Sequence, residues 1–290
     1  MIKQLTLSIA AIALLSACSV KEDRITNCKA PVTICVNPFS ITQEPFTKAT
    51  PVGEYSGVKQ LTLAFYAPDG TEVYQHSQAK GNLPEGETFG TFSTTLPIGS
   101  YTMVVLGYAL YGNDELALTS PTLAEYTVNA PRETFAATQA VDVTGTAALN
   151  LSATLDRIVS KLQIISNDGK TANVTNVRMT FSAGGRSFNP TTGLATSNTG
   201  FSSTVGNSAA AGATSSSIGY LFLATDEQTM NVTIETLDSG GNTIFSKTVT
   251  GVPFKRNRAT VLTGALYSAS ASGSSFELNT TWATDHTGTF

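Results

Sequence analysis

Short segments with alternating apolar residues recur along the chain, and turn-forming residues separate them. Leu61, Leu63 and Phe65, for example, alternate with polar or small residues. This period of two residues indicates a half-buried β-strand, because successive side chains of a strand point to opposite faces. The segment ends in a turn at Pro68 to Gly70, where proline presets one backbone dihedral and glycine accepts a positive φ. Long helical periodicity is absent, so the chain is predicted to be all-β and to form β-sandwiches.

The N-terminus has the pattern of an exported lipoprotein. Residues 1–17 combine a positive charge at Lys3 with an apolar stretch that is too short to span a bilayer, and small residues precede Cys18. We therefore predict a signal peptide over residues 1–17 and lipidation at Cys18. Each buried methylene of an acyl chain contributes roughly 0.8 kcal/mol, so several chains would attach the protein firmly to a membrane. Residues 18–30 are predicted to be a lipidated flexible tether, and no later segment is apolar enough for a second membrane span.

The remaining chain is long enough for two domains, and its strand candidates fall into two similar groups. A boundary between the two domains is predicted at Thr146 to Asn150. We therefore expect an N-terminal β-sandwich over residues 31–148 and a C-terminal β-sandwich over residues 149–290. Residues 182–217 consist almost entirely of Ser, Gly, Ala, Thr and Asn, and they are predicted to form a mobile or functional surface loop.

The charge balance argues against a nucleic-acid partner. The chain has 17 Lys and Arg residues against 21 Asp and Glu residues, which gives a formal net charge of −4. A nucleic-acid-binding protein would need a basic patch. Charged residues make up only 13% of the chain, and Ser, Thr, Asn and Gly supply the remaining polarity, as is typical of extracellular β proteins.

Residues that commonly carry catalysis or bind metals are sparse. The two histidines, His76 and His286, lie in no zinc-binding or nucleophile-elbow motif and are interpreted as surface residues. Neighbouring acidic residues lack the spacing of a calcium loop. Trp282 is interpreted as a core residue rather than a sugar-stacking platform, and the basic run 255–258 as a solvated turn. We therefore expect no catalytic residue, no enzyme activity, no metal and no cofactor.

Cys28 and Cys35 leave two alternatives open. An export compartment permits a disulfide between them. Fully extended, the intervening chain would hold them about 23 Å apart, whereas a disulfide requires a Cα separation of roughly 4.4–6.8 Å. They can pair only if Ala30 and Pro31 turn the chain back. Otherwise Cys35 lies in a strand over residues 32–36 and faces a core.

Several short motifs follow one another in a definite order. The lipid cysteine is followed by the charged run Lys21 to Asp23 and by Cys28. The further motifs are Leu61 to Gly70, Leu96 to Tyr101, Leu155 to Lys161 and Phe254 to Gly264. In this order the motifs resemble those of the fimbrial anchor subunits of Bacteroides-type bacteria, a FimB-like family of lipoproteins in the fimbrillin superfamily.

The resemblance implies two transthyretin-like β-sandwich domains and a place in a pilus built by strand exchange. In that family a protease removes the first strand of a stalk subunit, commonly after arginine, and the next subunit donates a strand to the vacated groove. Anchor subunits keep the first strand and the lipid. Here Arg24 precedes the first predicted strand, and the basic residue after that strand is Lys48. The anchor role is therefore favoured, with a stalk subunit, a tip adhesin or a surface glycan-binding lipoprotein as alternatives.

Two strands would carry the anchor role. On the implied mechanism, Val32, Ile34 and Val36 fill the groove of their own domain. The candidate donor strand presents one face made of Phe276, Leu278, Thr280 and Trp282. The alternative is that this tail is only the last strand of its own domain.

The expected partners follow from the same interpretation. They are the outer membrane, through the N-terminal lipid, and other fimbrial subunits, with host or bacterial surface ligands as a further option. The expected location is the outer membrane, with the protein lipid-anchored and exposed at the cell surface.

Overall fold

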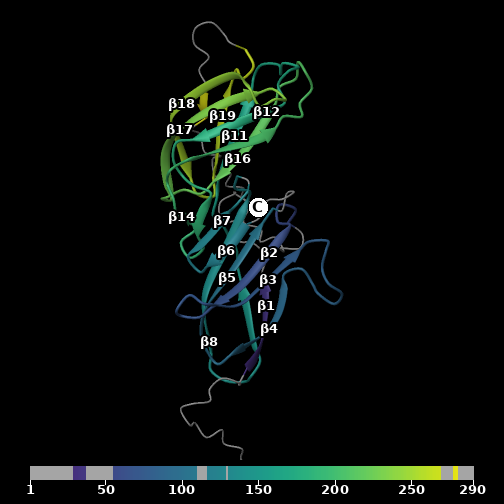
Figure 1. Ribbon diagram of the computed structural model, residues 1–290, viewed down its shortest axis with the longest axis vertical. Coiled ribbons are helices and arrows are strands. Elements are labelled where there is room, and N and C mark those ends of the chain that lie inside the picture. The colour runs from purple at the N-terminus through teal and green to yellow at the C-terminus, as the bar shows by residue number, and fades with distance from the viewer. Residues whose placement is uncertain (1–28, 37–54, 110–115, 129, 269–276, 280–290) are drawn as a thin grey trace, which may run out of the picture.

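The computed structural model describes residues 29–36, 55–109, 116–128, 130–268 and 277–279. The predicted signal peptide and most of the predicted tether, including Cys18, lie outside these residues. Every regular element of the described part is a β-strand, and none of it forms a helix long and apolar enough to cross a membrane. Figure 1 shows two sandwiches stacked along the long axis, with the N-terminal one below the C-terminal one.

The N-terminal sandwich consists of a three-stranded and a five-stranded sheet. The smaller sheet has the strand order β4 (Thr91–Pro97), β1 (Lys29–Val36), β9 (Leu149–Ala153). The larger sheet has the order β10 (Asp156–Arg157), β8 (Thr134–Val143), β5 (Gly99–Tyr108), β2 (Gln60–Tyr66), β3 (Glu72–Ala79).

The C-terminal sandwich consists of two four-stranded sheets. The first has the strand order β16 (Ser216–Leu221), β11 (Ser160–Ser166), β19 (Ala259–Gly264), β20 (Glu277–Asn279). The second has the order β15 (Phe201–Gly206), β12 (Asn176–Phe181), β17 (Glu227–Leu237), β18 (Thr243–Lys255).

Both sandwiches share one strand topology. The first strand of each lies between an antiparallel and a parallel neighbour, β1 between β4 and β9, and β11 between β16 and β19. The second strand of each lies between the third and the fifth in the opposite sheet, β2 between β3 and β5, and β12 between β15 and β17. The sequence-based prediction of an all-β chain with two tandem β-sandwiches is confirmed.

Two insertions join the sandwiches through a fifth sheet. The N-terminal sandwich contributes β6 (Leu116–Ser120) and β7 (Leu123–Tyr126), and the C-terminal one contributes β13 (Ser187–Asn189) and β14 (Leu194–Ala195). These strands form one sheet in the order β14-β13-β7-β6, in which Phe188 pairs with Ala124. The insertions therefore bridge the two sandwiches, as the position of β6, β7 and β14 in Figure 1 also shows.

Three apolar clusters stabilise this arrangement. One fills each sandwich, and the third lies between them, where side chains from the outer face of β2 and β5 meet residues of the C-terminal sandwich. In this third cluster the rings of Phe188 and Phe222 stack with their centroids 4.3 Å apart. Large buried aromatic side chains contribute both area and ring contacts, so the third cluster holds the sandwiches together.

The interpretation of residues 182–217 as a mobile or functional surface loop is wrong. This range contains β13, β14, β15 and the first residues of β16. Its small polar residues pair through their backbone groups, and Phe188 anchors the segment with 0% exposure. Because β pairing uses main-chain hydrogen bonds, a strand can form where side chains give no alternating apolar signal.

The domain boundary predicted at Thr146 to Asn150 does not coincide with the point where the chain passes from the N-terminal to the C-terminal sandwich. β9 begins at Leu149 and pairs with β1, and Leu155 is fully buried in the N-terminal core. The C-terminal sandwich begins at Ser160 with β11. Because β10 still pairs with β8 of the N-terminal sandwich, we propose that the division lies between Arg157 and Ser160.

Candidate assembly site

β1 is the central strand of the smaller N-terminal sheet. It pairs with β4 from Lys29↔Pro97 to Cys35↔Thr91, and with β9 from Val32↔Leu149 to Val36↔Ala153. In the described part of the chain, this sheet has no other strand. Removal of β1 would therefore leave β4 and β9 with unpaired edges that face each other across a groove.

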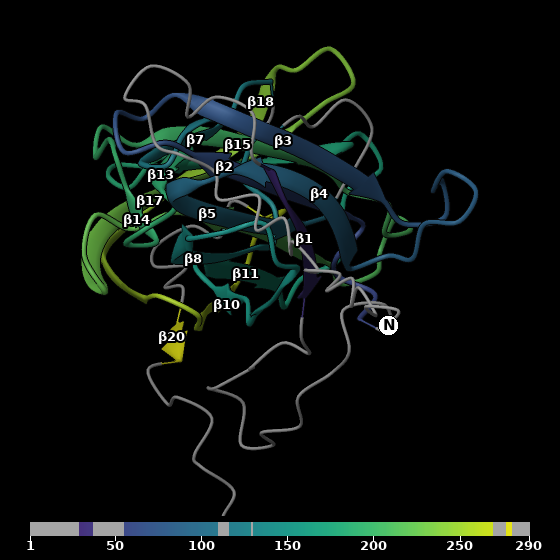
Figure 2. The same ribbon diagram turned by 90° about the horizontal axis from the view of Figure 1, so that it is seen from below.

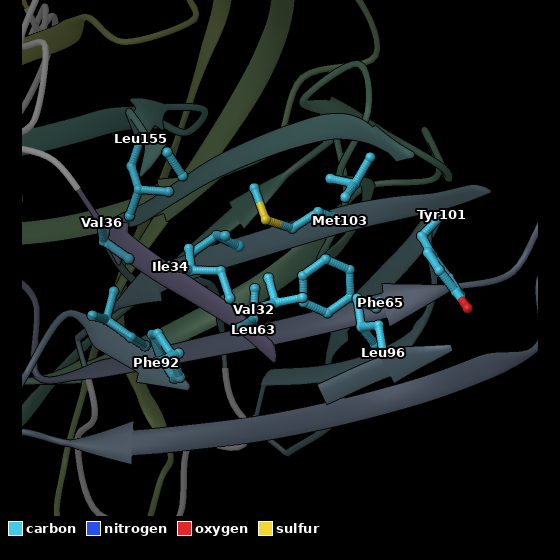
Figure 3. Packing of buried hydrophobic residues seen from close by; sticks show 14 of the residues in the cluster. Val32, Ile34, Val36, Leu63, Phe65, Phe92, Leu96, Tyr101, Met103 and Leu155 are labelled. Carbon is cyan, nitrogen blue, oxygen red and sulfur yellow. The ribbon is translucent and has the colours of Figure 1, made fainter. Parts of the chain in front are cut away.

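The side chains of β1 alternate between the core and the surface. Val32 and Ile34 are 1% and 0% exposed, and Val36 is also buried. Figure 3 shows these three side chains projecting from β1 into the cluster that contains Leu63 and Phe65. Full burial of such an aliphatic side chain contributes roughly 1.5–3 kcal/mol, so β1 supplies a substantial part of the N-terminal core.

Cys35 is exposed, because it lies on the outer face of β1. The expectation that it faces a core is therefore wrong. Cys28 lies outside the described residues. At about 3.3 Å per residue, the extended strand separates Lys29 from Cys35 by roughly 20 Å. A disulfide to the residue before Lys29 would therefore require β1 to leave its sheet.

β20 is the only described part of the predicted donor strand. It pairs antiparallel with β19, with Leu278 opposite Leu262, and it forms the edge of its sheet. Figure 2 shows β20 in yellow at the outer margin of the C-terminal sandwich. Phe276, Thr280 and Trp282 lie outside the described residues. The pairing of residues 277–279 is that of a last strand in its own domain, and a donor role stays a prediction.

Asp168 binds the backbone of residues 266–268, which precede β20 in the sequence. Its Oδ1 accepts a hydrogen bond of 2.8 Å from the backbone N–H of Leu266, and its Oδ2 accepts bonds of 2.8 Å from those of Tyr267 and Ser268. Burial acts to raise the pKa of Asp168, but these hydrogen bonds outweigh it and lower the pKa. The carboxylate therefore fixes residues 266–268, the last described residues before β20.

A charged network lies where the two sandwiches meet. Arg157 Nη2 lies 2.8 Å from Glu133 Oε1, and both side chains are largely buried, with exposures of 18% and 17%. Arg157 Nη1 donates to Asn257 Oδ1 at 3.0 Å, across the junction. The Tyr55 hydroxyl donates to Glu133 at 2.8 Å, and burial together with the Glu133 charge raises the pKa of Tyr55.

The basic run 255–258 therefore has a structural role beyond that of a solvated turn. Asn257 adopts a φ of 57°, which asparagine tolerates better than most residues. Arg256 pairs with Asp226 at 2.8 Å and donates to the Thr192 carbonyl at 2.8 Å. The turn between β18 and β19 thus connects to the insertion that contains β13 and β14.

Of the two histidines, the structure describes one. His76 is half-buried and its Nε2 lies 3.5 Å from Glu87 Oε1, whereas His286 lies outside the described residues. Within the described ranges, no group of three or more His, Cys, Asp or Glu side chains is placed to hold a metal ion. Sequence reasoning missed the junction between Arg157, Glu133 and Asn257, because its members are far apart in the chain and form no motif.

Several solved structures share this fold. A candidate adhesin from Bacteroides ovatus matches with a TM-score of 0.51 and 12% identity, over 86% of this chain and 95% of that chain. A candidate cell adhesion protein from Bacteroides ovatus ATCC 8483 matches with a TM-score of 0.50 and 13% identity, over 87% and 96%. The fimbrial anchor protein Mfa2 from Porphyromonas gingivalis matches with a TM-score of 0.49 and 11% identity, over 87% and 95%. At these identities the likeness to the two Bacteroides ovatus proteins shows the fold alone.

No curated protein sequence matches the chain. The chain belongs to a family of unknown function, DUF6562, whose model matches residues 26–288.

Proposed function

We propose that this member of the family is a structural subunit of a cell-surface fimbria, lipid-anchored at the base of the fibre through Cys18. The observation that carries the proposal is the position of β1. This strand completes its own sheet between β4 and β9, and its buried side chains fill the N-terminal core.

The position of β1 determines which partner the subunit can take. A subunit whose first strand stays in place has no open groove there, so it cannot accept a donor strand at that site. Arg24 precedes β1, so cleavage at Arg24 would leave the groove filled. Such a subunit joins the fibre only by donating a strand, and it therefore ends the fibre at the cell.

The C-terminal segment is the proposed donor. Its described part, β20, is a three-residue edge strand, and the chain before it is fixed by Asp168 up to Ser268. Strand donation provides affinity through backbone hydrogen bonds and selectivity through alternate side chains, which Phe276, Leu278, Thr280 and Trp282 would supply. The adhesin descriptions of the two Bacteroides ovatus proteins agree with a role at the cell surface.

Immunogold labelling of cells and of isolated fibres tests this role. The proposal expects label at the cell-proximal end of each fibre, and it expects Cys18→Ala to release labelled fibres into the medium. Cys35→Ala is the matched control, because Cys35 is exposed on β1 and carries no lipid in the proposal. Label along the fibre would identify a stalk subunit, label at the distal end would identify a tip adhesin, and either result overturns the basal position.

A further inference from the structure

The third strands of the two sandwiches occupy equivalent places but present different inner faces. In β15, Phe201 and Val205 pack against the C-terminal core on either side of the buried Ser203. In β3 the inward positions are Tyr74, His76 and Gln78, while the residues between them are exposed. Polar side chains at core-facing positions are costly unless they are hydrogen-bonded, so this departure from the shared pattern requires a reason.

The polar face of β3 lines a cavity of about 300 Å³. β3 is the edge of the larger sheet and β4 is the edge of the smaller one, so the cavity lies along the side of the N-terminal sandwich. Its other walls are the connection between these strands, with Glu87 and Thr88, and the start of β4, with Phe92. The volume is at the lower end of the ~300–1,000 Å³ range of small-molecule sites.

Gln78 makes the cavity wall rigid. Its side chain is 2% exposed, and its amide nitrogen donates to the Thr91 carbonyl at 2.8 Å and to Glu87 Oε2 at 3.3 Å. Its amide oxygen accepts a bond of 2.9 Å from the N–H of Gly90. Gln78 therefore positions the connection and orients Glu87, whose other oxygen lies 3.5 Å from His76 Nε2.

Aromatic rings form the second part of the cavity. The His76 ring meets the buried Phe92 ring edge to face, with centroids 6.0 Å apart, and lies 6.4 Å from the ring of Tyr74. The ring of Tyr74 in turn packs against that of Phe65, with the ring centroids 6.4 Å apart. His76 and Tyr74 are half-buried, so their rings are supported from behind while part of each faces the cavity.

We propose that this cavity binds one ring of a neutral saccharide. A sugar ring has an apolar face of C–H groups that can lie against the rings of Tyr74 and His76. Its hydroxyl groups can donate to the Glu87 carboxylate and accept from the Thr88 hydroxyl. Lys and Arg are absent from the lining residues, and the Glu87 carboxylate would repel a negative charge, so acidic sugars and phosphates are excluded.

Saccharide binding at this site is independent of the proposed place in the fibre. The cavity belongs to the β3–β4 side of the N-terminal sandwich and includes neither β1 nor the C-terminal segment. A basal subunit, a stalk subunit and a tip subunit would all carry it. Failure of either proposal would therefore leave the other unaffected.

Saturation-transfer NMR on the full lipidated protein tests the site. The ligands are the methyl glycosides of glucose, galactose and mannose, and the detergent has a phosphocholine headgroup so that it brings no sugar of its own. We expect saturable transfer to at least one glycoside. We expect His76→Ala and Glu87→Gln each to weaken its binding at least tenfold, because the first removes a stacking ring and the second a charged acceptor.

Gln75→Ala is the matched control, because Gln75 is exposed on the opposite face of β3. It should leave the dissociation constant unchanged. Glu87→Gln keeps the size of the side chain, so it tests the site even if His76→Ala disturbs the fold. The proposal is overturned if none of the three glycosides shows saturable transfer, or if the two cavity variants bind as tightly as the control.

Discussion

The two sandwiches have one topology but differ in how their first strands are connected. β1 begins the described part of the chain and is separated from β2 by residues 37–59. Only Ile158 and Val159 separate β10 from β11, and both are buried in the cluster between the sandwiches, so β11 is fixed to that junction. Both strands lie at the centre of their sheets, so the shared architecture gives them similar packing. Because 23 residues of sequence separate β1 from β2, we expect β1 to be the first strand that can be removed or exchanged.

The sheets that contain the two first strands differ at one edge as well. β19 is covered by β20 on its outer side, whereas β9 forms the edge of its sheet in the described part of the chain. The C-terminal sandwich thus has an added strand at a position where the described part of the N-terminal sandwich has none. Strand exchange in this molecule is therefore expected at the two ends of the chain, and the central elements should hold the sandwiches in place.

The largest effect is expected when the first strands are disrupted. Ile34→Asp and Ile164→Asp each place an unpaired charge at a fully buried position, so each should lower the free energy of unfolding by more than about 4 kcal/mol. Urea denaturation measures this loss. Cys35→Ser, at an exposed position of β1, should change it by less than about 0.5 kcal/mol.

A synthetic peptide with the sequence of residues 29–36 would then show whether β1 and β11 differ in their ability to be replaced. Because β1 has a long connection, its defective form can leave the groove and the peptide can take its place. The peptide should therefore raise the unfolding midpoint of Ile34→Asp and leave that of Ile164→Asp unchanged. Equal rescue of both variants, or of neither, would contradict the inference that β1 can be replaced and β11 cannot.

The junction between the sandwiches should give the next largest effect. Arg157→Met leaves the Glu133 carboxylate largely buried without its ion-pair partner, which should cost about 3 kcal/mol in urea denaturation. Lys255→Met breaks the much more exposed pair with Glu227 and should cost less than about 1 kcal/mol. Equal losses in the two variants would show that Arg157 does not hold the sandwiches together.

The smallest effect is expected at Asp168. Because the folded protein lowers its pKa, the carboxylate stabilises the fold above its ordinary pKa of about 3.9, and this contribution is lost as the pH falls through the lowered value. Asp168→Asn should therefore cost about 1 kcal/mol at pH 7, after allowance for its partial exposure, and less at pH 3.

Urea unfolding at the two pH values measures this difference. The exposed Asp156 provides the control Asp156→Asn, which should leave the midpoint at pH 7 unchanged. A loss for Asp168→Asn that is the same at pH 3 as at pH 7 would show that the charge of the carboxylate does not fix residues 266–268.

Local patterns in the sequence predicted most strands because a period of two residues is a local property. Leu61 to Phe65 lies in β2, and the apolar run before Tyr108 lies in β5. The pattern did not show that residues 155–165 divide into β10 and β11, since Ile158 and Val159 continue the apolar run but are buried in the cluster between the sandwiches. Within residues 182–217 the large apolar residues are few and widely spaced, namely Phe188, Leu194, Phe201 and Val205, so they gave little signal of structure.

Pairing between distant segments could not be predicted in the same way. The shared topology depends on which strands become neighbours, and the Arg157–Glu133 contact depends on the packing of the two sandwiches. The alternation of Tyr74, His76 and Gln78 was readable as a strand. Only the structure shows that these residues face inward and line a cavity.

The most direct test of the retained first strand is the intact mass and N-terminal sequence of the protein taken from the cell surface. We predict a chain that starts at Cys18, carries acyl groups and includes residues 29–36. A mature chain that starts beyond Val36 would contradict this account, because β1 would then be absent from the groove between β4 and β9.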